Sequence, residues 1–353
     1  MTVDSDAVTS TVRISDFVLG LPKCEMHLHL DGTLEPSMKL DLARRNNIEI
    51  PQSTTAQIRE SFRFHDLPTF LAVHYSNMNV LWTSRDYEDL AYSYLQISAQ
   101  QNVRHTEMFF DPQLHTSRGV PFPDIVNGYR RAIVRARIDF GMSAELIMCF
   151  LRDYTAEYAM ATLMEALPYK DWIIGVGLDS DELDHPPAEF SEVFARARSE
   201  GFLVTMHCDV DQVDSAEHIR QAIADLHSNR IDHGLNVLDD PDLVIAAREK
   251  GLGFTVCPLG YGTHPCGMAP ELERIHAMLE AGLKVSVGSD DPPYFGGYLA
   301  ENLQACIDVG GFTEAELVTI SRNAFETAWV SERRRVELLE ELDDYARRHG
   351  LPA

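Results

Sequence analysis

Eight short apolar segments, separated by segments with helical periodicity, constrain the fold of this chain more than any other feature. Most are about five to eight residues long and rich in β-branched or aromatic residues, which is typical of a strand buried on both faces. Helical segments lie between them, and several begin with Pro in the first turn, where its missing N–H costs little. The predicted strands are 23–30, 103–110, 144–150, 172–178, 202–207, 230–233, 253–257 and 284–288, and the clearest helices are 187–200, 215–227, 241–250 and 270–281.

Strands that alternate with helices form parallel βα units, and eight such units predict an α/β fold of the (β/α)8 TIM-barrel class. With 353 residues the chain is longer than the roughly 250 residues of a bare barrel, so it must carry additions. We expect extra helices at 34–101, after the first strand, and at 298–349, at the C-terminal end. No repeat or low-complexity tract divides the chain, so residues 1–353 are predicted to form a single domain.

Two segments in these additions leave alternatives open. Residues 61–67 suggest a lid over the mouth of the barrel, although Phe62 and Phe64 alternate and could equally belong to a short packed core segment. The charged segment 331–348 is predicted to be a solvated helix packed on the barrel rather than a helix that binds a partner.

Composition limits the partners and the compartment. A net charge of −25 disfavours nucleic acid, because binding to phosphates requires a basic surface. No apolar run reaches the roughly 20 residues that span a bilayer, and the N-terminal residues lack a signal-peptide pattern, so we expect a cytoplasmic protein that binds no membrane. The six cysteines show no CxxC spacing and are predicted to be reduced. The partner is therefore expected to be a small molecule, and the sequence says nothing of the oligomeric state.

Metal-ligand residues stand at the ends of several predicted strands. His27 and His29 are separated by one residue, so on an extended strand both side chains point to the same face. His207 ends another strand and Asp290 follows the eighth. Because the C-terminal ends of barrel strands meet at one rim, these residues form a set of three nitrogens and one carboxylate. Such a set suits one Zn²⁺ ion per chain with an open position for water, which the ion activates at neutral pH.

The motifs that contain these residues resemble the adenosine and adenine deaminase family of the amidohydrolase superfamily. The resemblance runs from about residue 20 to residue 330 and is closest to the adenine-deaminase-like branch. The segments that carry it are 22–32 (PKCEMHLHLDG), 109–116 (FFDPQLHT), 177–182 (GLDSDE), 230–234 (RIDHG) and 289–298 (SDDPPYFGGY). Ser180 takes the place where adenosine deaminases have a glycine that faces the purine.

The resemblance also implies roles for individual residues. His27, His29, His207 and Asp290 would ligate Zn²⁺, and His29 would also contact the substrate. His233 would hold the attacking hydroxide, while Asp290 would pass a proton toward the departing amine. Asp291 would accept a hydrogen bond from the imidazole ring of the purine, and Ser180 would face the purine edge.

The sequence departs from the family at two places. After the histidine of the fifth strand the family reads His-Ala-Gly-Glu, and the Glu protonates purine N1; this chain has Val210 at that position. Asp209 is our preferred substitute, with Asp211 and Glu217 as alternatives, although these acids could instead cap the helix that begins near Ser215. The second departure, CPLGYG at 257–262 in place of Cys-Pro-Xaa-Ser-Asn, predicts a remodelled rim after the seventh strand.

These features predict a zinc-dependent aminohydrolase that converts a 6-aminopurine, such as adenine, adenosine or a substituted relative, to the 6-oxopurine and ammonia. Two alternatives stay open because the family Glu is missing. One is a hydrolase of the same fold that cleaves another C–N bond, and the other is a purine-binding protein without catalysis.

Overall fold

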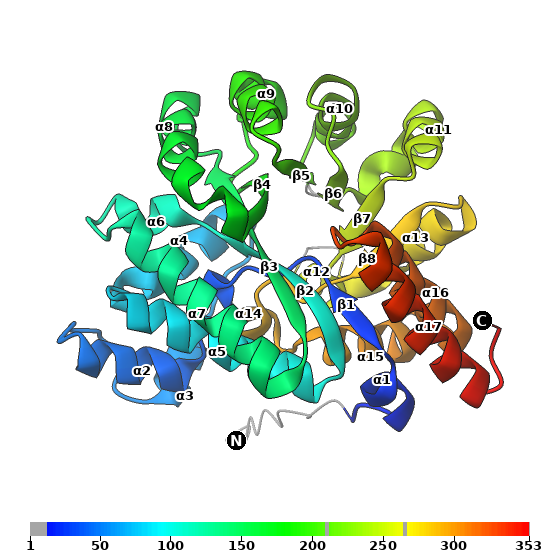
Figure 1. Cartoon of the computed structure of the whole chain (residues 1–353), viewed down its shortest axis with the longest axis horizontal. Coiled ribbons are helices and arrows are strands. Elements are labelled where there is room, and N and C mark those ends of the chain that lie inside the picture. The colour runs from blue at the N-terminus through cyan, green and yellow to red at the C-terminus, as the bar shows by residue number, and fades with distance from the viewer. Residues whose placement is uncertain (1–12, 209–211, 264–266, 353) are drawn as a thin grey trace, which may run out of the picture.

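The computed structural model describes residues 13–208, 212–263 and 267–352. Eight parallel strands pair in sequence order, β1 to β8, and the helices surround them, as the prediction of a TIM barrel requires (Figure 1). The strands are β1 Lys23–Glu25, β2 Val103–Phe110, β3 Ser143–Leu151, β4 Ile173–Asp179, β5 Leu203–Cys208, β6 Arg230–His233, β7 Gly253–Val256 and β8 Lys284–Val287. The predicted fold class is confirmed, and most strand boundaries agree with the sequence to within one residue.

The first strand differs from the prediction of a continuous strand over 23–30. Regular pairing ends at Glu25, and residues 28 and 29 form only isolated bridges, to Asp290 and Phe109. Here the barrel closes, since the amide of His29 donates to the Asp290 carbonyl and the amide of Asp290 donates to the His27 carbonyl, both at 3.0 Å. Gly288 permits this approach, because a Cβ atom there would lie 2.5 Å from the His27 carbonyl oxygen.

Most of the helices between consecutive strands cover the outside of the barrel, whereas the short α12 lies at its mouth. α7 illustrates why, since its buried residues Ile125, Tyr129, Ile133 and Ala136 recur at helical spacing, and Gly141 ends the helix with a φ of 70°. These helices are α6 Pro112–Thr116, α7 Phe122–Phe140, α8 Ala156–Ala166, η3 Leu167–Trp172, η4 Pro187–Phe190, α9 Ser191–Ser199, α10 Ser215–Arg220, η5 Gln221–Asp225, η6 Leu235–Asp239, α11 Pro241–Lys250, α12 Pro258–Tyr261 and α13 Met268–Glu280.

The extra helices lie where the sequence predicts them. Between β1 and β2 the chain forms η1 Asp31–Thr33, α2 Pro36–Arg45, α3 Thr55–Ser61, α4 Leu67–Asn77, η2 Met78–Val80 and α5 Ser84–Gln100, and α1 Asp16–Gly20 precedes β1. After β8 it forms α14 Pro292–Phe295, α15 Leu299–Asp308, α16 Glu314–Thr327 and α17 Glu332–Arg348. α17 buries Leu338, Leu342, Tyr345 and Ala346 on one face, which agrees with a solvated helix packed on the barrel.

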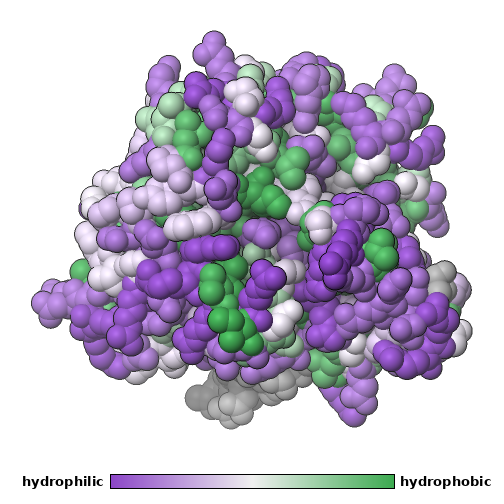
Figure 2. Space-filling view, in the orientation of Figure 1, coloured by the Kyte–Doolittle hydropathy of each residue, from purple (hydrophilic) through white to green (hydrophobic). Residues whose placement is uncertain are grey.

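The outer surface is largely polar. In Figure 2 the visible face is mostly hydrophilic and its apolar residues form separate patches. The five cysteines among the described residues are buried and form no disulfide with one another. Across the described ranges, no helix combines the length and the apolar character that a membrane crossing requires.

Candidate active site

The four predicted metal ligands come together at the C-terminal ends of the strands. His27 and His29 follow β1, His207 lies near the end of β5, and Asp290 follows β8. The Nε2 atoms of His29 and His207 are 3.2 Å apart. Asp290 Oδ1 lies 3.5 Å from Nε2 of His27 and 3.5 Å from Nε2 of His29. One nitrogen from each of His27, His29 and His207 lies within 4.8 Å of the other two, and Asp290 lies beside His27 and His29; all four residues are buried.

These distances fit a tetrahedral metal site. Ligands at about 2.1 Å from a tetrahedral Zn²⁺ lie about 3.4 Å from one another, close to the three separations given above. The fit is also chemical, because Nε2 of His27 is a buried nitrogen without a hydrogen-bond partner. A buried nitrogen without a partner carries a desolvation penalty that a coordinated ion would remove. The group is therefore suited to a divalent cation.

The ionisation states of the ligands favour the same conclusion. Burial, together with the neighbouring charge of His27, lowers the pKa of His29 to about 3. Burial and the other histidines lower the pKa of His207 well below its ordinary value. Burial alone would raise the pKa of Asp290, but the surrounding histidines, His27 foremost, hold it well below its usual range. His29, His207 and Asp290 therefore hold the neutral and ionised forms that bind metal. At His27 burial lowers the pKa, but Asp290 and Asp232 raise it above the ordinary value overall.

A fully buried carboxylate, Asp232 on β6, orients two of the ligands. Thr205 and Thr255 donate their hydroxyl protons to Asp232 at 2.6 and 2.8 Å, and Nδ1 of His207 lies 3.5 Å from the same carboxylate. Nδ1 of His27 lies 2.8 Å from Thr255 Oγ1 and 3.2 Å from the Thr255 carbonyl oxygen. Because the carbonyl can only accept, His27 donates from Nδ1. Its Nε2 lone pair is thereby left for a metal.

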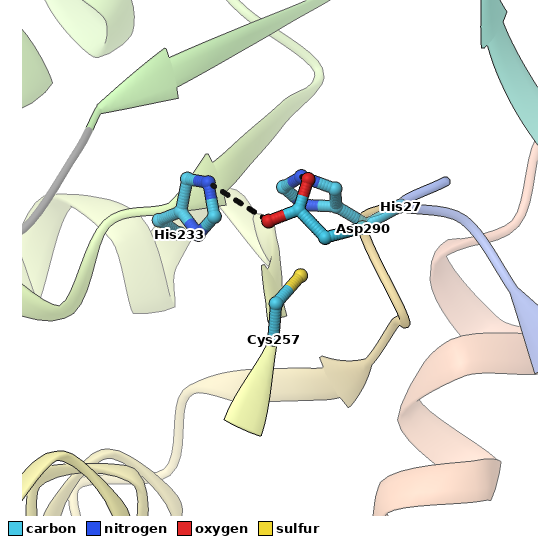
Figure 3. Close-up of side chains that lie close together, drawn as sticks. All are labelled: His27, His233, Cys257 and Asp290. Carbon is cyan, nitrogen blue, oxygen red and sulfur yellow. Dashed lines mark ion pairs between the residues drawn. The ribbon is translucent and has the colours of Figure 1, made fainter. Parts of the chain in front are cut away.

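His233 ends β6 beside the ligands. Figure 3 shows its imidazole facing the carboxylate of Asp290, with Nε2 of His233 at 3.9 Å from Asp290 Oδ2. Its Nδ1 lies 3.2 Å from the hydroxyl of Tyr261. The thiol of Cys257 lies in the same group, but burial raises its pKa well above the ordinary value, so it stays protonated and is a poor ligand.

The predicted substrate-reading residues Asp291 and Ser180 line the same cavity as His29, His207 and Asp290. Asp291 is buried next to Gly32, and burial together with Asp290 raises its pKa well above the ordinary value. Ser180 follows β4, and its hydroxyl lies 2.5 Å from the hydroxyl of Tyr75 on α4. The φ angles of Ser180, His233 and Asp290 are 78°, 59° and 61°, in the left-handed region that side chains rarely adopt. Strained backbone of this kind gathers at functional sites.

The cavity offers water-sized molecules a volume of about 110 Å³. One wall is apolar and is formed by Phe64, Leu67, Phe70, Leu71 and Phe295. The segment 61–67 therefore contributes to the mouth of the cavity through Phe64 to Leu67. Phe64 also packs on Phe70, with ring centroids 5.1 Å apart, so the segment both lines the mouth and packs against α4.

Of the acids proposed to replace the family Glu, the structure describes only Glu217. Asp209, Val210 and Asp211 lie outside the described residues. Glu217 is not at the site, because it lies on the exposed side of α10 and accepts hydrogen bonds from Arg220 at 2.7 Å and from Gln221 at 3.0 Å. Asp214 precedes α10 but makes no side-chain capping bond.

Several functional residues were missed by the sequence reasoning. Asp232 stands inside the RIDHG motif, one residue before His233, and this position was the available signal. Tyr261 lies in the CPLGYG departure at 257–262, which was its signal. Thr255 and Tyr75 carried no signal of their own, because the elements that bring them to the site are distant in sequence.

Comparisons with known proteins agree with this geometry. The sequence model described as adenosine deaminase matches residues 22–345. An uncharacterized deaminase from Schizosaccharomyces pombe is 48% identical over 335 residues, covering 94% of this chain and 98% of that protein. An adenine deaminase from Rhodospirillum rubrum is 43% identical over 331 residues, covering 91% of this chain and 96% of that protein.

Two solved structures share the fold. The adenine deaminase from Arthrobacter aurescens superposes with a TM-score of 0.89 at 37% identity, covering 93% of this chain and 99% of that one. A Zn-bound amidohydrolase from Burkholderia ambifaria superposes with a TM-score of 0.87 at 27% identity, covering 97% of each chain. Because similarity at this level spans nearly the whole barrel, the chain belongs to the adenosine deaminase family.

Proposed function

We propose that this protein is a Zn²⁺-dependent hydrolytic deaminase of an uncharged 6-aminopurine. The reaction consumes water and releases the 6-oxopurine and ammonia. The cluster of His27, His29 and His207 with Asp290 beside it, three of which line a partly aromatic cavity, is the observation that carries this proposal. The similarity to adenine deaminases supports the choice of substrate.

In the proposed mechanism the four ligands hold one Zn²⁺ ion. When bound, the ion lowers the pKa of water to about 7 and so supplies a nucleophile at neutral pH. His233 faces the same point and hydrogen-bonds the attacking oxygen. Asp290, the partner of His233 across 3.9 Å, passes a proton toward the departing amine. Asp209 is our proposal for the donor of the proton to purine N1.

Three residues are proposed to orient the purine. Asp291 accepts a hydrogen bond from the imidazole ring, Ser180 contacts the purine edge, and His29 lies against the ring. Burial of Asp291 beside an apolar wall excludes water from its contact and strengthens it.

The charge of the cavity supports an uncharged substrate. Among its lining residues that the structure describes, none is Lys or Arg, whereas Asp66, Asp179, Asp290 and Asp291 are present. Residues 209–211 and 264–266 contain no Lys or Arg either. A phosphate group would find acidic neighbours and no cation, so we propose that a free base or an uncharged derivative is bound.

Ammonia release tests the proposal. The zinc-loaded protein is incubated with adenine, adenosine, N6-substituted adenines and other aminated heterocycles, with Asp290→Ala as the blank. Release from a 6-aminopurine, lost in the blank, supports deamination, and Asp209→Asn and Asp211→Asn then locate the proton donor. If a folded protein that binds zinc releases no ammonia from any compound of the panel, the proposed deamination is contradicted. Hydrolysis of another C–N bond or a binding role is then favoured.

A further inference from the structure

The rim after β7 brings Tyr261 into the active site. Tyr261 ends the short helix α12, is only 2% exposed and lines the same cavity as His233 and Asp290. Its ring centroid lies 5.9 Å from that of His233, and its hydroxyl lies 3.2 Å from His233 Nδ1. This is the segment in which the sequence departs from the Cys-Pro-Xaa-Ser-Asn pattern.

The contact involves the nitrogen of His233 that faces away from the chemistry. Nε2 of His233 is turned to Asp290, whereas Nδ1 is turned to Tyr261. A hydrogen bond at one ring nitrogen fixes both the ring plane and the protonation pattern of the other. The hydroxyl of Tyr261 therefore lies where it can fix the ring plane of His233 and the protonation of Nε2, the nitrogen that faces the reacting group.

The backbone on both sides of this contact is held rigidly. In α12 the amide of Leu259 donates to the buried side chain of Asn302 at 2.9 Å, and Asn302 in turn donates to the Tyr298 carbonyl at 3.0 Å. On the side of His233, the amide of Gly234 donates to the Cys208 carbonyl at 3.0 Å. A Cβ atom at Gly234 would lie 2.7 Å from Ile231, so this turn has little freedom.

We infer that Tyr261 is a positioning residue that sets the orientation of the His233 imidazole for catalysis. The inference rests on the proposed function, because it assigns a role within that reaction. It acts through His233 and does not touch the reacting atoms itself.

Three Tyr→Phe variants of the zinc-loaded enzyme test the role, since each removes a single hydroxyl. Tyr261→Phe should lower kcat by about 10- to 100-fold, the usual effect of losing an orienting partner, with KM, zinc content and thermal midpoint close to those of the parent. Tyr75→Phe should instead raise KM, because its hydroxyl contacts Ser180 rather than His233. Tyr92→Phe is the matched control, since Tyr92 bonds Asp139 on the surface at 2.7 Å, and should change neither constant.

A second readout does not depend on turnover. The ¹⁵N resonances of the His233 imidazole, assigned by their absence in His233→Gln, should move in Tyr261→Phe and stay in place in Tyr92→Phe. If kcat and the resonances are both unchanged in Tyr261→Phe, the inference is overturned. It is also overturned if KM and the thermal midpoint change as much as kcat. If the parent releases no ammonia from any 6-aminopurine, the proposed function fails, and the resonances alone then decide whether Tyr261 orients His233.

Discussion

Gly32 lies directly against the carboxyl group of Asp291. A Cβ atom at position 32 would lie 1.7 Å from Asp291 Oδ1 and 2.6 Å from its carboxyl carbon. No side chain can occupy that space without displacing Asp291, which is buried and 4% exposed. The two residues are far apart in sequence, and the closure of the barrel between β1 and β8 brings them together.

Gly32→Ala should therefore impair substrate binding. The added methyl group forces the Asp291 carboxyl out of its position, and we expect KM for the 6-aminopurine to rise by about 10-fold or more, as for the loss of a buried hydrogen bond. The zinc content of the variant shows whether the metal ligands, which are residues other than Gly32 and Asp291, are still in place. An unchanged KM in a folded, zinc-loaded variant would show that Asp291 does not contact the substrate.

Asp232→Asn should weaken metal binding although Asp232 is not a ligand. The carboxylate accepts from Thr205 and Thr255 and faces His207, so an amide in its place misorients two ligands at once. We expect the affinity for Zn²⁺ to fall by about 10- to 100-fold, measured by competition with a chelator. Asp239→Asn, on the surface beside Arg274, serves as the matched control. Equal affinities in both variants would contradict a role of Asp232 in holding the ligands.

Nucleotides should be poor substrates. Since the described lining of the cavity contains Asp residues and no Lys or Arg, kcat/KM for AMP should lie at least roughly 100-fold below that for adenine. Parallel ammonia assays at equal concentrations measure the ratio. Comparable rates for the two compounds would disprove an uncharged substrate while leaving deamination itself intact.

The buried pair of Glu107 and Arg230 should make stability depend on pH in acid. Their side chains meet at 2.6 Å and both are fully buried. Burial alone would raise the pKa of Glu107, but Arg230 and His105 lower it to about 2. A folded pKa below the ordinary value of about 4.5 means that the ion pair stabilises the fold above pH 4.5. This stabilisation is lost as the pH falls toward 2, and it amounts to about 3 kcal/mol.

Urea unfolding of the parent and of Glu107→Gln measures this effect. At pH 7 the variant should be less stable by about 3 to 5 kcal/mol, because Arg230 is left buried without its partner. The difference should shrink as the pH falls, since protonated Glu107 resembles Gln. A difference that stays constant from pH 7 to pH 3 would show that the charge of Glu107 does not matter.

Much of the fold and of the metal site could be predicted from the sequence because both depend on local patterns. Buried parallel strands are read from continuous apolar runs, and their C-terminal ends must meet at one rim, so the sequence alone was enough to group His27, His29, His207 and Asp290. Resemblance to the family then added roles for Asp291, Ser180 and His233.

Tertiary structure decided the contacts that periodicity does not encode. The interrupted first strand follows from barrel closure at Gly288, and the positions of Tyr75, Thr255 and Tyr261 follow from how separate βα units pack around one cavity. Likewise, Glu217 was a reasonable acid by sequence distance, but α10 turns it toward Arg220 and the solvent. The sequence alone determined which strand ends carry the proposed metal ligands, because the pattern of a strand is local. Packing across the barrel determined which side chains orient those ligands and His233, because these residues are distant in sequence and meet only in the folded protein.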